Sequence, residues 1–255
     1  MKSKSLKVLL VLLCSLLFLA GCGKQEAKPL TIAAAASLEK IFTQRLIPLF
    51  NERYPKIKIE GTYSGSGNLA LQIEQGLPAE IFVSASPKQM EALERKGIIK
   101  KENVVELLEN KVVLIVPKAS ATKIGSFEEL ANCKHVALGD YKSVPAGQYA
   151  QEILTKLDLW EAVSKKASFG TGVTQVLHWV AEGSADAGVV YATDALTTKN
   201  VQVVAEASQG ILTKPVVYCL GVLKTTDESK LFAKFLLSDE AQKIFEEYGF
   251  APIKR

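Results

Sequence analysis

Short β-branched or apolar runs alternate along this chain with stretches whose apolar residues recur at helical spacing, and this alternation strongly constrains the fold. Strand-like runs occupy 30–34, 57–62, 81–84, 112–116, 135–138, 187–190 and 201–204. Helical patterns occupy 38–50, 88–96, 148–157, 174–182, 228–237 and 240–248, and Pro48 is expected to bend the first of them. Regular β–α alternation predicts an α/β fold of mainly parallel sheets with helices on both faces.

Four short loops without a charged side chain each lie between an expected strand and an expected helix. They are Ala36-Ser37-Leu38, Tyr63-Ser64-Gly65-Ser66-Gly67, Val144-Pro145-Ala146-Gly147 and Gly170-Thr171-Gly172-Val173. The start of a helix exposes unpaired N–H groups and partial positive charge, so several converging starts would bind an anion without Lys or Arg. Ser37 can cap its helix and also donate its hydroxyl, and glycine lets backbone approach an anion closely. The loops therefore predict a site for a small, fully ionised oxyanion.

The positions of these loops predict two lobes. Two loops precede residue 113 and two follow it, so a site between lobes would let all four converge beyond the carboxyl ends of the strands. Segment 110–118 is expected to cross from one lobe to the other, and segment 213–218 to return. The expected division is 30–113 for lobe 1, 114–212 for lobe 2 and 213–255 for the return segment of lobe 1.

The N-terminus indicates export. Three lysines, at positions 2, 4 and 7, precede an apolar run at 8–20 that is too short to span a bilayer, which is the layout of a secretory signal. The run ends in Leu19-Ala20-Gly21-Cys22, which resembles the lipobox of bacterial lipoproteins and implies cleavage before Cys22 and lipidation of that residue. We expect residues 1–21 to be a signal peptide and 22–29 a lipidated tether. The protein would then work outside the cytoplasm, anchored by lipid to the bacterial membrane.

The charge balance argues against a polyanionic partner. Removal of residues 1–21 takes away three lysines and no acid, so the 31 basic residues of the whole chain fall to 28, against 27 acidic ones. A net charge this close to zero lacks the excess of basic residues that is typical of a nucleic-acid-binding protein. Nucleic acid is therefore not an expected partner.

Cysteine and histidine usage predicts neither a metal site nor a catalytic pair. Cys14 leaves with the signal, and Cys133 and Cys219 each adjoin an apolar run. These two thiols are interpreted as separately buried, with a disulfide between them as the alternative in an oxidising compartment. No Cys pair or Cys/His pair has metal-ligand spacing, and His135 and His178 are interpreted as structural.

Five blocks of sequence carry a family resemblance that covers nearly the whole chain after the signal. They are 34–38 (AAASL), 76–85 (GLPAEIFVSA), 139–150 (GDYKSVPAGQYA), 183–195 (GSADAGVVYATDA) and 245–250 (FEEYGF). Together, and in this order, they resemble the molybdate-binding proteins of ABC transporters. The resemblance implies the type II periplasmic-binding-protein fold, in which two lobes close over a tetrahedral dianion held by hydroxyls and backbone amides.

The resemblance also implies functional details. It implies a monomer that is not an enzyme, has no cofactor and no metal cation site, and delivers its oxyanion to a membrane ABC permease. Ligand contacts fall on the matching positions Ser37, Ser66, Ala146, Val173 and Tyr191. The second loop reads Ser-Gly-Ser-Gly, so its donor is either Ser64 or Ser66. Many relatives have an acidic residue and Asn before the valine, where this chain has Thr171-Gly172.

The loops restrict the ligand further. Phosphate is partly protonated near neutral pH, and a phosphate site gains from a carboxylate that accepts this proton. The loops contain no Asp or Glu, and Asp140 and Asp194 lie several residues from the predicted donors. Molybdate, tungstate and sulfate carry no proton, so donors alone suit them. We expect molybdate or tungstate, which the sequence does not separate, with sulfate or another small oxyanion as the alternative.

Two enzyme classes fit less well. Gly65-Ser66-Gly67-Asn68-Leu69-Ala70 has the spacing of a dinucleotide-binding turn, but the next strand ends in Val83-Ser84-Ala85-Ser86 and supplies no acid for a ribose. An exported serine hydrolase would need a nucleophile motif, and no G-x-S-x-G is present. An exported binding protein is therefore the preferred interpretation.

Overall fold

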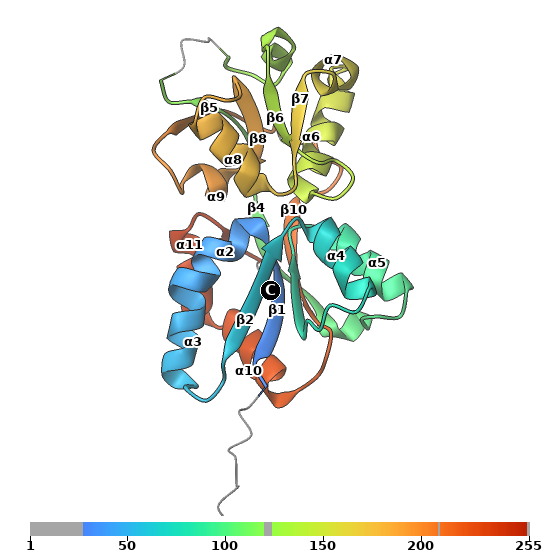
Figure 1. Ribbon diagram of the computed structural model, residues 1–255, viewed down its shortest axis with the longest axis vertical. Coiled ribbons are helices and arrows are strands. Elements are labelled where there is room, and N and C mark those ends of the chain that lie inside the picture. Colours follow the sequence, from blue (N-terminus) through green and yellow to red (C-terminus); the bar gives the residue numbers. More distant parts are fainter. Residues whose placement is uncertain (1–27, 120–123, 209, 254–255) are drawn as a thin grey trace, which may run out of the picture.

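The computed structural model describes residues 28–119, 124–208 and 210–253, and it contains two sheets, each flanked by helices (Figure 1). The predicted signal peptide, most of the tether, and Cys14 and Cys22 lie outside the described residues. The six-stranded sheet has the order β11-β4-β10-β3-β1-β2, and the five-stranded sheet has the order β7-β6-β8-β5-β9. We call the two halves the first lobe and the second lobe. The α/β prediction is confirmed.

The first lobe is built from both ends of the described chain. Its strands are β1 (Leu30–Ala35), β2 (Ile59–Ser64), β3 (Ile81–Ser84), β4 (Val104–Asn110), β10 (Val216–Val222) and β11 (Ala251–Pro252). Its longer helices are α3 (Ile47–Arg53), α4 (Ser66–Glu74), α5 (Pro87–Arg95), α10 (Asp227–Leu236) and α11 (Asp239–Glu247). Short turns of helix are η1 (Ala36–Leu38), α2 (Glu39–Ile41), η2 (Phe42–Leu46) and η3 (Lys101–Asn103).

The second lobe is one continuous stretch of chain. Its strands are β5 (Val112–Pro117), β6 (Val136–Gly139), β7 (Ala167–Gly170), β8 (Ala187–Tyr191) and β9 (Val201–Glu206). Its helices are η4 (Glu128–Asn132), α6 (Pro145–Lys156), α7 (Trp160–Ser164), α8 (Val173–Ala181) and α9 (Ala192–Ala195). None of the helices in the described ranges of either lobe combines the length and apolar character that a membrane span requires.

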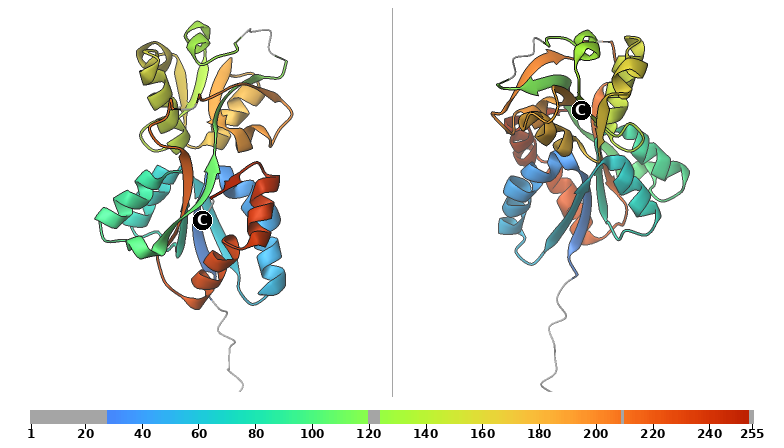
Figure 2. Two further views of the ribbon diagram at one scale, coloured as in Figure 1. Left: turned by 180° about the vertical axis from the view of Figure 1, so that it is seen from behind. Right: turned by 45° about the horizontal axis from the view of Figure 1, so that its top comes forward.

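Each sheet is mixed, which corrects the expectation of mainly parallel sheets. β1 runs parallel to β2 and β3, and β6 runs parallel to β7 and β8, as βαβ units require. The strands next to the crossings are antiparallel, because the chain leaves the first lobe along β4 and returns to it along β10 (Figure 2). In the second lobe, the chain enters along β5 and leaves along β9, and these two neighbouring strands are also antiparallel.

The lobes are joined by two crossings. The chain passes from β4 to β5 at Lys111, and it returns between Glu206 and Val216. The predicted boundary after residue 113 falls inside β5, whose residues Val112 and Val113 already pair with β8. Cys133 and Cys219 are buried, free thiols in different lobes, as the interpretation of separate thiols expected.

Helices cover both faces of the first sheet because apolar residues occupy successive positions of its strands (Figure 1). Ala33 packs with Leu69 of α4 and Leu93 of α5, whereas the neighbouring Ile32 and Ala34 belong to the cluster on the opposite face. Strand side chains alternate between faces, so an unbroken apolar run is what a strand covered on both sides needs.

Candidate functional site

A small cavity lies between the two lobes, bounded by the loops that follow β1, β2 and β3 and by the starts of α6, α8 and α9. Its volume is about 10 Å³, so the loops of the two lobes nearly meet there. All six candidate ligand residues line it: Ser37, Ser64, Ser66, Ala146, Val173 and Tyr191. None of the described residues that line it has a charged side chain. The structure thus brings together residues that are far apart in the sequence, and their role as ligands stays a prediction.

The three longer helices that begin at the cavity have no side-chain cap, a feature that they share with the short α7 away from it. α4, α6 and α8 begin at Gly65, Val144 and Gly172 without a side chain that accepts from their first N–H groups. In contrast, Ser86, Thr226 and Ser238 cap the starts of α5, α10 and α11. Uncapped starts leave donors and partial positive charge directed at the cavity. The starts of α4, α6 and α8 therefore bring N–H groups and partial positive charge to the cavity, and in α4 the N–H of Gly67 already donates to Ser143.

Ser66 is oriented by the backbone of the neighbouring loop. Its hydroxyl is completely buried and accepts a 3.0 Å hydrogen bond from the backbone N–H of Ala85. An oxygen that accepts in this way keeps its own hydrogen for another partner. Ser64, in contrast, is only half-buried and ends β2.

Ser37 does not cap its helix, which corrects one expectation. The chain enters η1 at Ala35, so Ser37 lies inside the turn of helix, where its side chain is beyond the N-cap position. Its Oγ instead lies 2.9 Å from the hydroxyl of Tyr218, which is completely buried in β10. Asn110 Nδ2 donates to the same tyrosine over 3.4 Å. Sequence reasoning missed Tyr218 and Asn110, because both lie in crossing segments that carry no local motif.

Tyr191 presents a buried hydroxyl without a partner. The side chain is 1% exposed, and its hydroxyl has no hydrogen bond to any described residue. Burial raises the pKa of Tyr191 well above its usual value, so the hydroxyl keeps its proton. A buried donor left unpaired costs free energy, and such a cost in a cavity wall indicates a place for a ligand.

Asp194 lies closer to the site than the sequence suggested. α9 starts at Ala192, and its first turn folds the Asp194 carboxylate back to accept a 3.2 Å hydrogen bond from the backbone N–H of Tyr191. The side chain is 4% exposed, and burial raises its pKa to about 7. Asp194 is not among the residues that line the cavity. The carboxyl group of Asp194 therefore contacts the backbone of a residue that lines the cavity, without lining the cavity itself.

The lobes touch directly beside the cavity. The backbone N–H of Gly67 donates a 2.8 Å hydrogen bond to the carbonyl of Ser143 in the second lobe. A Cβ at Gly67 would overlap that carbonyl, and one at Gly65 would lie 2.8 Å from the carbonyl oxygen of Thr171. These glycines therefore permit an approach of the lobes that no larger residue would allow.

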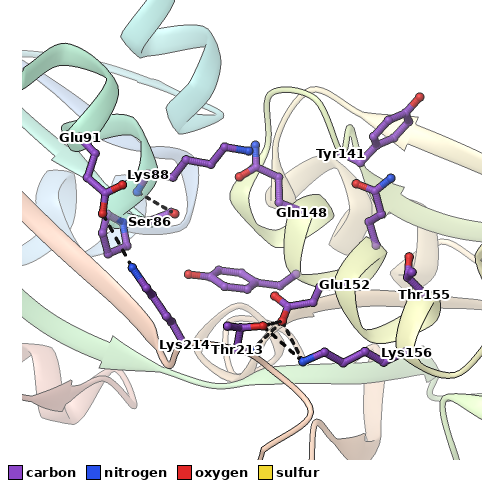
Figure 3. Close-up of a pocket in the computed structure, with 13 residues that line it drawn as sticks. Ser86, Lys88, Glu91, Tyr141, Gln148, Glu152, Thr155, Lys156, Thr213 and Lys214 are labelled. Carbon is purple, nitrogen blue, oxygen red and sulfur yellow. Dashed lines mark hydrogen bonds and ion pairs between the residues drawn. The ribbon is translucent and has the colours of Figure 1, made fainter. Parts of the chain in front are cut away.

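A second, wider groove of about 620 Å³ runs along the junction of the lobes, between α5, α6 and the returning segment (Figure 3). Four of the five charged side chains among the described residues that line it are paired, and the fifth is Lys88. Glu152 accepts from both the N–H and the hydroxyl of Thr213, each over 2.6 Å, and Lys214 pairs with Glu91 over 3.9 Å. The groove thus joins α6 to the return crossing through paired side chains.

Comparisons with known proteins agree with this geometry. A family model described as bacterial extracellular solute-binding protein matches residues 30–251. YvgL of Bacillus subtilis, provisionally named an ABC transporter substrate-binding lipoprotein, is 40% identical over 257 residues, which cover 97% of this chain and 98% of its own. The molybdate-binding protein ModA of Haemophilus influenzae is 37% identical over 244 residues, 92% of this chain and 95% of its own.

A solved structure gives the same result. The substrate-binding domain of a transporter from Clostridium difficile, provisionally assigned to molybdenum, is 35% identical with a TM-score of 0.66, over 89% of this chain and 99% of its own. These matches confirm the family resemblance carried by the five blocks of sequence. The chain belongs to the bacterial extracellular solute-binding proteins.

Proposed function

We propose that this chain captures molybdate or tungstate outside the cytoplasm and delivers it to a membrane ABC permease. The names of its relatives support this ligand, since ModA of Haemophilus influenzae is a molybdate-binding protein. The cavity supports it physically, because uncapped helix starts and hydroxyls suit a fully ionised oxyanion that has no proton to donate.

The proposed ligand contacts are the hydroxyls of Ser37, Ser66 and Tyr191 and the backbone N–H groups of Ala146 and Val173. Ser66 is preferred to Ser64 as the donor of the second loop, because Ala85 occupies its acceptor side and leaves its hydrogen available. Hydrogen bonds to an ionised acceptor contribute roughly 1.5–3 kcal/mol each, so five of them support tight binding without a counter-ion.

The observation that carries the proposal is the hydroxyl of Tyr191. It is buried without a partner among the described residues, at a cavity where three helices begin without side-chain caps. An oxyanion placed among these groups would satisfy all of them at once. A role as a monomeric binding protein without enzyme activity, and lipid attachment through Cys22, complete the proposal.

Titration calorimetry tests the ligand. The purified protein should release heat with molybdate and tungstate and much less with phosphate, which carries a proton that the site cannot accept, and sulfate is titrated as the alternative ligand. Comparable heats with all four anions would contradict the donor-only site, and preferential binding of sulfate would establish the alternative ligand.

Serine variants test the position of the site. Ser37→Ala and Ser66→Ala should each weaken molybdate binding by about 1.5–3 kcal/mol while the far-ultraviolet circular dichroism stays unchanged. Ser168→Ala, on the exposed edge strand β7, is the matched control and should bind like the parent. Parental affinity in both site variants would show that the proposed site is misplaced.

A further inference from the structure

We propose that Asn110 is a positioning residue that fixes the direction of a hydrogen-bond relay, Asn110 to Tyr218 to Ser37, and so makes Ser37 a donor toward the cavity. The inference rests on the proposed function, because it explains how this site would favour an unprotonated oxyanion. Asn110 ends β4 at the outward crossing and does not line the cavity itself.

The orientation of the Asn110 amide follows from its neighbours. The backbone N–H of Lys111 can only donate, and it lies 2.8 Å from Asn110 Oδ1. The opposite end of the amide must therefore be the nitrogen, and its two hydrogens point to Thr193 Oγ1 at 2.9 Å and to the Tyr218 hydroxyl at 3.4 Å. A flipped amide would bring its nitrogen, a donor, against the backbone N–H of Lys111, which is also a donor.

The amide then dictates what Tyr218 does. Asn110 Nδ2 cannot accept, so the single hydroxyl hydrogen of Tyr218 has Ser37 Oγ, 2.9 Å away, as its acceptor among the described residues. Tyr218 is completely buried, and burial raises the pKa of its hydroxyl well above the usual value, so the hydrogen stays in place. Ser37 Oγ accepts from Tyr218 and keeps its own hydrogen for the cavity that it lines.

The relay also connects the two lobes. Asn110 and Tyr218 lie on the two neighbouring crossing strands of the first lobe, and Thr193 lies in α9 of the second. The same amide that orders the donor at Ser37 therefore contacts the lobe that closes over the ligand.

Asn110→Asp tests the direction of the relay. An aspartate at this position accepts from Tyr218, so the tyrosine hydroxyl must accept from Ser37, whose hydrogen then points away from the cavity. Ser37 would offer a lone pair, which repels molybdate but accepts the proton of hydrogen phosphate. We expect the ratio of the two affinities, molybdate over phosphate, to fall by roughly ten- to a hundredfold in mildly alkaline buffer.

The ratio separates hydrogen-bond direction from charge. In mildly alkaline buffer, molybdate and hydrogen phosphate are both dianions. The negative charge added by aspartate therefore lowers both affinities alike, and its effect cancels in the ratio. Asn132→Asp, an exposed position in η4, is the matched control and should leave the ratio unchanged. Asn110→Ala, which removes the donor without adding an acceptor, should fall between the parent and Asn110→Asp, and it keeps the test available if the aspartate variant does not fold.

A double variant shows whether the effect passes through Tyr218. In Tyr218→Phe the relay is cut, so adding Asn110→Asp to it should no longer change the ratio. An unchanged ratio in Asn110→Asp alone, or an equal drop with Phe at position 218, would overturn the relay. Failure of the parent protein to bind molybdate would instead overturn the proposed function, so the two failures are distinguishable.

Discussion

Single residues at the cavity show a conflict between stability and binding. Tyr191 buries a hydroxyl that finds no partner among the described residues, and Asp194 buries a carboxyl with one hydrogen bond from the backbone of Tyr191. Both arrangements destabilise the chain when no ligand is bound, because buried polar groups lose water without full compensation. Of the two, Tyr191 lines the cavity, where a bound ligand can supply the missing partner, whereas Asp194 does not line it.

Tyr191→Phe should therefore separate binding from stability. The variant removes an unpaired hydroxyl, so the free energy of unfolding without ligand should stay level or rise by up to about 1 kcal/mol, whereas molybdate binding should weaken by roughly 1.5–3 kcal/mol. Urea unfolding and titration calorimetry measure the two quantities. A variant that loses stability and keeps its affinity would show that Tyr191 is only a packing residue.

Asp194 should make stability depend on pH. Its pKa is about 7 in the folded chain against an ordinary 3.8, so folding binds a proton between these values, and stability falls as pH rises through this window. Asp194→Asn keeps an acceptor for Tyr191 and removes the titration. As the pH rises from about 5 to about 8, the free energy of unfolding of the variant should increase by roughly 2–3 kcal/mol relative to that of the parent. Parallel stability profiles for the two proteins in urea unfolding would contradict this.

At the scale of elements, the first helical region shows how a proline is accommodated within a helix. The first helical region runs from η1 through α2 and η2 into α3, and Pro48 occupies the first turn of α3. The wider π turn of η2 precedes it, so the expected bend is a change of helix type, which accommodates the missing N–H of proline. Local periodicity predicted the helix, whereas the hydrogen-bond pattern inside it depends on packing that the sequence does not display.

Gly67, in the first turn of α4, tests whether closure needs bare backbone. Alanine there favours the helix by about 0.5–1 kcal/mol, yet its Cβ would overlap the Ser143 carbonyl when the lobes meet. Gly67→Ala should thus melt at the same or a higher temperature without ligand and bind molybdate at least roughly tenfold more weakly, as titration calorimetry would measure. Gly125→Ala, whose Cβ would lie at an ordinary contact distance of 3.7 Å from Glu129 Oε2 among the described residues, is the control. Parental affinity in Gly67→Ala would mean that binding does not require this contact.

At the scale of the whole molecule, the alternating pattern predicted the α/β class, and the polar loops predicted the two lobes and which residues meet between them. Neither pattern predicted β4 and β10 as neighbouring antiparallel strands, since their pairing joins residues such as Glu106 and Cys219 that no local signal relates. For the same reason Asn110 and Tyr218 escaped notice. Which distant residues become neighbours depends on how the two crossing strands pair, and this pairing is a property of the chain topology that local sequence patterns do not reveal.

Closure should be visible in solution. If the ligand bridges donors of both lobes, it stabilises the closed arrangement, and small-angle scattering should show a smaller radius of gyration after molybdate is added. Sulfate at the same concentration provides the comparison. Identical scattering with and without molybdate would contradict a closing motion.

The position of β10 in its sheet bears on how the chain acquires its structure during export. This strand lies between β3 and β4, yet it is among the last segments to leave a secretion channel that threads the polypeptide N-terminus first. The second lobe is contiguous and has all its strands by Glu206, whereas the first lacks its central strand until Val222 has emerged. The half of the protein that is made first is thus completed last, and until then β3 and β4 present unpaired edges to any chaperone stationed at the exit.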